Sequence, residues 1–281
     1  MNIPAKIGLG LSAAAAAGWV LVQNRMLVTD RITLSVKDLP KAFDGKKILH
    51  LSDLHGKRYG ENFNNLINSC AFLEPDYIFF TGDLFTRTET DLEPKLVLMR
   101  RLLKLGSVYY CNGNHECDAP DKANVLNLAL AKEGVHVLVN STERIYEDGD
   151  YISVTGVALP KEHYRKNNGF KDLTEITPTL MKKLVGSPDR SSVCFLLAHD
   201  PLPFKAYAKW GADVTFSGHI HGGVIRLPFI GGLLSPERKF FPKYSKGLYH
   251  IGRSKLVVSA GLGKFRLNNP SQLLLITLKQ A

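Results

Sequence analysis

A pattern of strand, helix and strand that occurs twice in succession in the first half of this sequence constrains the fold more than any other feature. Short apolar runs of strand length alternate there with longer stretches of helical length. The expected strands are residues 47–52, 77–81 and 108–111, and the expected helices are residues 62–73 and 92–105. Two βαβ units in tandem hold their three strands parallel and side by side, which predicts an α/β fold.

The rest of the sequence predicts a second sheet. Residues 29–40 alternate apolar and polar side chains and should form a strand that leads into the first sheet. Further runs of strand character, with few helices between the later ones, are residues 151–157, 193–197, 214–217, 248–251, 256–259 and 273–278. We therefore predict two mixed β-sheets packed face to face and flanked by helices. Because no linker interrupts residues 29–281, this part should be one domain.

Acidic, amide and histidine side chains follow several expected strands at the points where the strands end. The three early strands are followed by Asp53 and His55, by Asp83, and by Asn114 and His115. Two later strands are followed by His199 and by the pair His219 and His221. Ligands gather outside the carboxyl ends of parallel strands, so we expect these side chains to converge.

These side chains predict a binuclear metal site. Asp and His together suit a borderline divalent cation such as Mn, Fe or Zn. The candidate ligands are Asp53, His55, Asp83, Asn114, His199, His219 and His221. One ion takes about four to six ligands, so two ions that share a carboxylate fit this set better. Two divalent ions, two aspartates and a bridging hydroxide leave a charge of about +1, which attracts a phosphate group.

The order of these motifs resembles that of the calcineurin-like metallophosphoesterases over residues 45–281. The matching motifs are Asp53 with His55, Gly82-Asp83, Gly113-Asn114-His115-Glu116, His199, and Gly218-His219-Ile220-His221. All of these elements occur in order, which is a specific match. The resemblance implies a four-layer αββα sandwich. It also implies hydrolysis of phosphodiester, phosphomonoester or pyrophosphate bonds by a metal-bridging hydroxide.

The resemblance also implies a role for each site residue. One metal ion would bind Asp53, His55 and His221, the other would bind Asn114, His199 and His219, and Asp83 would bind both. His115 would protonate the leaving oxygen or orient the phosphoryl group, which suits a side chain that titrates near neutral pH.

The chain departs from the family pattern at Thr86. Related phosphatases often carry there an aspartate that holds the catalytic histidine, so how His115 is held stays open at this point. The next residue, Arg87, keeps its place in the motif. We expect Arg87 either to contact the substrate phosphate or to be a surface charge.

The N-terminus carries an uncharged apolar stretch, residues 7–22, preceded by Lys6. Counted from Ile3 it has 20 residues, which falls within the about 17 to 25 that span a bilayer, since Lys6 can extend toward the head groups. A cleavable signal peptide is the alternative, with Ala15 and Ala17 as a small-x-small site, but the apolar run continues beyond them. We predict that residues 1–28 form an uncleaved, single-pass anchor in the cell membrane. The side of the catalytic domain stays open, an extracytoplasmic position being favoured.

The charge balance favours a phosphate-bearing partner. Lys and Arg number 36 against 26 Asp and Glu, a net charge of +10, which suits phosphoester substrates or an anionic membrane surface. No basic run with interleaved aromatic residues stands out, so nucleic acid is not the expected partner. The alternatives are a nuclease on the same fold and a membrane-tethered protein that binds without catalysis. The complete ligand set argues against the second alternative.

A further resemblance concerns the substrate. Several features are similar to those of bacterial membrane-associated phosphoesterases. They are the expected anchor, Leu39-Pro40, Phe43-Asp44-Gly45, and Gly222-Gly223 with Arg226-Leu227-Pro228. Some members of that group resemble the UDP-diacylglucosamine pyrophosphatases of lipid A synthesis, which implies an envelope or lipid-linked substrate. Residues 226–246 mix apolar and basic side chains. They predict either a lid over a lipid tail or a hairpin packed against the core.

Overall fold

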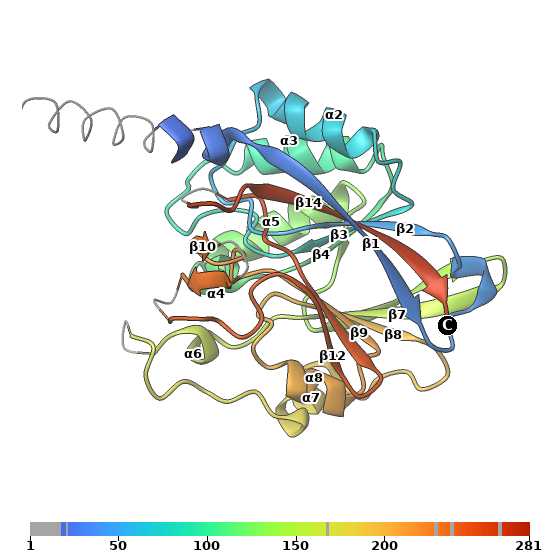
Figure 1. The fold of residues 1–281 in the computed structure, drawn as a ribbon. Coiled ribbons are helices and arrows are strands. Elements are labelled where there is room, and N and C mark those ends of the chain that lie inside the picture. Colours follow the sequence, from blue (N-terminus) through green and yellow to red (C-terminus); the bar gives the residue numbers. More distant parts are fainter. Residues whose placement is uncertain (1–17, 21, 167–168, 228–229, 237–238, 264–265) are drawn as a thin grey trace, which may run out of the picture.

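Two six-stranded mixed sheets pack face to face, and helices cover their outer faces (Figure 1). The structure is a computed structural model that describes residues 18–20, 22–166, 169–227, 230–236, 239–263 and 266–281. The predicted α/β architecture of two mixed sheets flanked by helices is confirmed.

The first sheet has the order β1-β14-β2-β3-β4-β5. Its strands are β1 (Leu27–Val36), β2 (Lys47–Leu51), β3 (Tyr77–Thr81), β4 (Ser107–Cys111), β5 (His136–Val137) and β14 (Ser271–Gln280). Strands β2, β3 and β4 are parallel neighbours, as the tandem βαβ pattern predicts. Strand β14 lies between β1 and β2, parallel to β1 and antiparallel to β2.

The second sheet has the order β12-β13-β9-β8-β7-β6. Its strands are β6 (Ser141–Glu147), β7 (Asp150–Val157), β8 (Cys194–Ala198), β9 (Val214–Ser217), β12 (Gly247–Ile251) and β13 (Ser254–Val258). The inner four strands are parallel, whereas β6 and β12 are antiparallel to their neighbours. A separate hairpin joins β10 (Ile225–Leu227) and β11 (Gly231–Leu234).

Helices form the outer layers. On the first sheet lie α2 (Asn64–Ala71), α3 (Glu93–Leu102) and α5 (Pro120–Lys132), and on the second lie α6 (Lys161–Tyr164), α7 (Pro178–Val185) and α8 (Phe204–Trp210). The short helix α4 (Asn114–Asp118) begins just after β4, and 3-10 turns occupy Lys41–Phe43 and Glu61–Phe63.

Three buried layers of side chains hold these elements together. Ile78 and Phe80 of β3 belong to the layer under α2, α3 and α5, whereas Tyr77 and Phe79 belong to the layer between the sheets. A strand buried on both faces is apolar at every position, which explains its continuous apolar sequence. Tyr207 and Trp210 of α8 belong to the third layer, on the outer face of the second sheet.

The predicted strands agree with observed ones to within a few residues, but β5, β6, β10 and β11 were not predicted as strands. The longest of these four is β6. Its sequence is largely polar and it lies at the edge of the second sheet, with most of its side chains exposed or half-buried. An edge strand does not need an apolar run, so the sequence of β6 lacks the apolar pattern that indicates a strand.

Residues 18–20 and 22–25 are helical and lead into β1. Residues 1–17 and 21, which make up most of the predicted anchor, lie outside the described residues. Within the part of the chain that the structure describes, no helix combines the length and the apolar character needed to cross a membrane.

Candidate metal centre

The candidate ligands lie at one edge of the two-sheet sandwich, where the carboxyl ends of strands from both sheets meet. Asp53 and Asp83 follow β2 and β3 in the first sheet, and His199 and His219 follow β8 and β9 in the second. Three sets of acidic and histidine side chains have ligand atoms within 4.8 Å of one another. These sets are Asp53, His55 and His221; His55, Asp83 and His115; and Asp53, Asp83 and His199.

Asp83 lies at the centre of this arrangement. Its Oδ2 is 3.4 Å from His199 Nε2, 3.7 Å from His55 Nε2 and 3.9 Å from His115 Nε2. Two ligand atoms that share one ion lie roughly 3 to 4 Å apart, because each bond is about 2.0 to 2.2 Å long. One carboxylate oxygen is therefore within sharing distance of histidines on two sides.

The other predicted ligands complete two overlapping groups. Asn114 Oδ1 lies 3.0 Å from His199 Nε2 and 2.9 Å from His219 Nδ1. On the opposite side, His221 Nε2 lies 3.7 Å from Asp53 Oδ1. All seven predicted ligands thus come together, and His115 lies beside them.

Hydrogen bonds between the two sheets orient these ligands. Nδ1 of His199 donates to the Thr81 carbonyl oxygen at 2.6 Å, which leaves Nε2 as the nitrogen that faces Asp83. The carboxylate of Asp53 accepts from the backbone N–H of His219, at 3.1 and 3.2 Å to its two oxygens. Each sheet therefore holds a ligand of the other.

Five of the candidate ligands have backbones in the left-handed region. Their φ values are 54° for Asp53, 52° for His55, 53° for Asp83, 66° for His219 and 56° for His221. Non-glycine residues seldom adopt this conformation, and each instance costs on the order of 1 kcal/mol or more. Such strain persists where the surrounding structure imposes it, and it gathers at functional sites.

Two glycines allow the chain segments to approach closely enough. A Cβ at Gly113 would lie 2.4 Å from Asp83 Oδ1, and a Cβ at Gly218 would lie 2.4 Å from Asp53 Oδ2. Any other residue at either position would displace one of the central carboxylates.

Glu116 ties two of the ligand-bearing loops together. Its buried carboxylate accepts hydrogen bonds from the backbone N–H groups of Asp83, Leu84 and Gly113, at 2.9, 2.9 and 2.7 Å. Burial raises the pKa of Glu116 to about 7, and the negative charge of Asp83 acts in the same direction. Sequence reasoning included Glu116 in a motif but assigned it no role.

The electrostatics of the site are dominated by burial and by the two aspartates. Burial works against charge on His199, yet the carboxylates of Asp83 and Asp53 raise its pKa to about 10. Burial lowers the pKa of His55 to about 4, because the opposing effect of Asp83 is smaller. Burial also favours a neutral Asp83, but His199, His115 and His55 hold its pKa well below the usual value.

His115 is held by Arg87 rather than by the aspartate that Thr86 replaces. The backbone N–H of Arg87 donates to His115 Nδ1 at 3.1 Å, and Arg87 Nη2 lies 3.2 Å from His115 Nε2. The guanidinium also pairs with Asp118, whose Oδ2 lies 2.9 Å from Nη1. Arg87 is therefore partly exposed and lies beside His115, in contact with both ring nitrogens.

The donor set fits a pair of divalent cations. The carboxylates of Asp53 and Asp83 are buried, with exposed fractions of 0% and 2%, and buried negative charges require compensating positive charge. Imidazole nitrogens, carboxylates and an amide oxygen, converging at ligand spacing, suit Mn, Fe or Zn. These residues therefore fit the binuclear site that the sequence predicts.

Arg266 is a neighbour of the site that sequence reasoning missed. It is 3% exposed, and its Nη2 lies 3.3 Å from His221 Nδ1. Nε and Nη1 are buried without a hydrogen-bond partner among the described residues. Burial lowers the pKa of Arg266 to about 10. No strand-end motif marks this arginine in the sequence.

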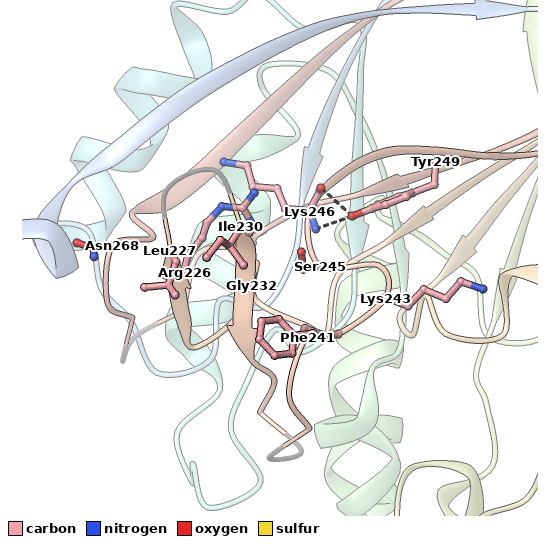
Figure 2. A pocket seen from close by; sticks show the side chains of 12 residues that line it. Arg226, Leu227, Ile230, Gly232, Phe241, Lys243, Ser245, Lys246, Tyr249 and Asn268 are labelled. Atoms are coloured by element: carbon pink, nitrogen blue, oxygen red, sulfur yellow. Dashed lines mark hydrogen bonds between the residues drawn. The ribbon is translucent and has the colours of Figure 1, made fainter.

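Two cavities are relevant to substrate binding, and one of them adjoins the ligands. One, of about 440 Å³, is the mouth of the site and is lined by His55, Gly56, Thr86, His115, His221, Val224 and Pro236. The other, of about 640 Å³, lies beside the β10–β11 hairpin (Figure 2). Arg226 and Lys246 contribute positive charge to its lining, and Ile230 and Phe241 contribute apolar surface.

For residues 226–246 we predicted either a lid or a hairpin packed against the core. The segment contains a hairpin, but Phe240 and Phe241 do not pack into the core. Phe240 and Phe241 are 70% and 62% exposed, and Ile230 at the hairpin turn is 63% exposed. The hairpin and the segment after it therefore present apolar side chains to the outside. The hairpin is flanked by Val224 and Pro236, which line the mouth of the site.

The family model for calcineurin-like phosphoesterases matches residues 46–223. The chain belongs to this family. The match includes all seven candidate ligands of the phosphoesterase and His115. Candidate clusters for a binuclear metal site therefore lie where the family resemblance predicts them.

Bacterial relatives match nearly the whole phosphoesterase. The metallophosphoesterase YkuE of Bacillus subtilis is 28% identical over 92% of this chain and 86% of its own length. The UDP-2,3-diacylglucosamine pyrophosphatase LpxG of Chlamydia trachomatis is 24% identical over 94% of both chains. The phosphodiesterase YaeI of Escherichia coli is 25% identical over 95% of this chain and 91% of its own length.

Proposed function

We propose that this phosphoesterase hydrolyses phosphoester or pyrophosphate bonds at two divalent metal ions that share Asp83. The position of Asp83 Oδ2, 3.4 Å from His199 Nε2 and 3.7 Å from His55 Nε2, carries the proposal. A carboxylate oxygen between two groups of ligands is the arrangement that a binuclear hydrolase needs.

Each ion would have its own set of side chains. One set is Asp53, His55 and His221, and the other is Asn114, His199 and His219. Bound ions would act as Lewis acids on a water nucleophile and on the phosphoryl oxygens. The chain itself fixes where the ligands stand, through Glu116 and through the hydrogen bonds between the sheets.

His115 and Arg87 would serve the leaving-group side. Arg87 Nη2 and His115 Nε2 lie 3.2 Å apart at the mouth of the site. Two hydrogen-bond donors so close together can both donate to one phosphoryl oxygen. A proton on His115 Nε2 is then available to the oxygen that leaves.

The substrate that we propose is lipid-linked. The cavity beside the hairpin combines cations with exposed apolar side chains, which suits an anionic head group joined to acyl chains. The relative LpxG is named as a pyrophosphatase that acts on a diacylated sugar nucleotide. An N-terminal anchor within residues 1–28 would raise the local concentration of such substrates.

Metal reconstitution tests this function. Full-length protein in detergent should be stripped of metal and then supplied with Mn²⁺, Fe²⁺ or Zn²⁺. We expect at least one ion to restore hydrolysis of bis-p-nitrophenyl phosphate and of a diacylated sugar pyrophosphate, and chelation to abolish both activities. Absence of hydrolysis of mono- and diester reporters and of lipid pyrophosphates with every ion would contradict the proposal.

A further inference from the structure

Arg266 is a buried cation whose donors are largely unused. Its side chain is 3% exposed, and two of its three nitrogens have no hydrogen-bond partner among the described residues. A buried guanidinium that lacks partners is costly, because the desolvation of the charge is not offset by hydrogen bonds. An unpartnered buried guanidinium in a native fold is therefore expected to form its hydrogen bonds with a bound ligand.

The third nitrogen of Arg266 points to where that partner binds. Nη2 lies 3.3 Å from Nδ1 of His221, one of the predicted ligands. His221 and His55 stack with ring centroids 5.2 Å apart, and both line the cavity at the mouth of the site. The Arg266 guanidinium thus contacts a residue that lines the cavity at the mouth of the site.

The N-terminal helix holds the backbone of Arg266 on both sides. The Asn24 side chain donates to the Arg266 carbonyl oxygen at 3.2 Å and accepts from the Arg266 N–H at 3.2 Å. Two residues later, Trp19 Nε1 donates to Asn268 Oδ1 at 3.1 Å. Asn268 lies at the edge of the cavity beside the hairpin, as Figure 2 shows.

The strand that follows the metal motif holds the same loop from its other side. The Leu267 N–H donates to the Val224 carbonyl oxygen at 2.9 Å, and the Arg226 N–H donates to the Leu267 carbonyl oxygen at 3.0 Å. The loop that carries Arg266 therefore lies between the N-terminal helix and β10. A shift of that helix would move the guanidinium relative to His221.

We propose that Arg266 binds an anionic phosphoryl oxygen of the substrate beside His221, and that Asn24 of the N-terminal helix positions it for this task. The inference rests on the proposed phosphoesterase function and names a residue that binds the substrate. It also makes the segment that would anchor the protein a part of the substrate site.

Inhibition by inorganic phosphate tests the role of Arg266. Metal-loaded, full-length Arg266→Met should show KM for a diester reporter and Ki for phosphate raised by about 10- to 100-fold, the loss expected for a charge-assisted hydrogen bond. Arg266→Lys keeps the positive charge but lacks the planar set of N–H donors of a guanidinium. Its Ki for phosphate should therefore fall between those of Arg266→Met and the parent. In Arg266→Gly, added guanidinium should lower the Ki for phosphate again.

The control is Arg253→Met. Arg253 is exposed at the far end of the second sheet, and its Nη2 lies 3.5 Å from Asp213 Oδ1. The substitution should leave KM and Ki unchanged. Unchanged Ki values in metal-loaded Arg266→Met and Arg266→Lys would overturn the role of Arg266. A change in the metal content or the Tm of Arg266→Met, with its Ki for phosphate unchanged, would likewise show that Arg266 serves only to pack the structure.

The positioning role of Asn24 has its own readout. Asn24→Ala should raise the Ki for phosphate by a smaller factor than Arg266→Met does, with metal content unchanged. In a variant that already carries Arg266→Met, the added Asn24→Ala substitution should change the Ki little further. An unchanged Ki in Asn24→Ala would remove the helix from the proposal. A parent that binds phosphate through Arg266 by calorimetry but hydrolyses no ester would refute the proposed function and leave this inference standing.

Discussion

The backbone N–H of Arg87 donates a hydrogen bond to Nδ1 of His115 at 3.1 Å. A ring nitrogen that accepts carries no proton, so any proton that His115 gives to a substrate must come from Nε2. That nitrogen faces Asp83, with 3.9 Å between Nε2 and Asp83 Oδ2. A backbone donor therefore orients the imidazole and leaves Nε2 as the nitrogen that faces the site.

We expect His115→Ala to keep its metal ions and to lose about 10²- to 10⁴-fold in kcat, the usual contribution of a positioned acid. The loss should be smaller for p-nitrophenyl esters, because p-nitrophenolate leaves without a proton. Steady-state rates on leaving groups of increasing pKa, with metal content measured in parallel, test this expectation. A loss of equal size on all leaving groups would restrict His115 to orienting the phosphoryl group.

Asp83→Asn and Asp53→Asn should differ in metal content. Asp83 would be shared, so Asp83→Asn should lose both ions and nearly all activity, whereas Asp53→Asn should weaken mainly one ion. Metal analysis and calorimetric titration with Mn²⁺ measure the difference. Full activity with normal metal content in Asp83→Asn would rule out the binuclear arrangement.

Glu116→Gln should destabilise the ligand loops. The amide offers one acceptor where the carboxylate serves three backbone N–H groups, so the free energy of unfolding should fall by about 1 to 3 kcal/mol. Metal affinity should fall with it, since the Asp83 and Gly113 loops are no longer tied. Urea unfolding measures the change, with the partly exposed Glu143→Gln as control. Equal stability of Glu116→Gln and the parent would contradict this role.

The hairpin aromatics should matter for lipid substrates alone. Replacing Phe240 and Phe241 with Ser should lower activity on a lipid-linked pyrophosphate in bilayers at least several-fold, with little effect on a soluble reporter. Both rings are exposed, and Phe241 lines the basic cavity. Phe72→Ser is the matched control, since Phe72 is 83% exposed at the end of α2. Equal lipid activity in the double variant and the parent would rule out contact between these rings and the bilayer.

Full-length protein should fractionate with membranes, and a chain that begins at Thr29 should remain in the supernatant. The expectation follows from the apolar residues 3–22. Alkaline carbonate extraction separates an anchored protein from one that is bound at the surface. Recovery of the full chain in the soluble fraction would contradict the anchor.

Much of this arrangement could be predicted from the sequence, since periodicity and strand-end residues are local signals. The parallel strands β2, β3 and β4 and the seven converging ligands follow from them. The contact of Arg266 with His221 and the contact of Arg87 with His115 could not be predicted in this way, because each joins segments that are distant in sequence. Arg266 reaches His221 through a loop that Asn24 holds, and neither link has a local pattern. Strand β6 was missed because a polar edge strand lacks an apolar run.

The position of β14 also determines when the fold can be completed. Strands β2, β3 and β4 are close in sequence and can pair while the chain is still being synthesised, but β1 has β14 as its neighbour along all ten paired positions. The last ten residues of the first sheet, Ser271–Gln280, must leave the ribosome before β1 can join β2. Pairing across so long a sequence separation is slow. The first strand to emerge therefore waits for the last, and activity should appear only after β14 has been synthesised and has paired with β1.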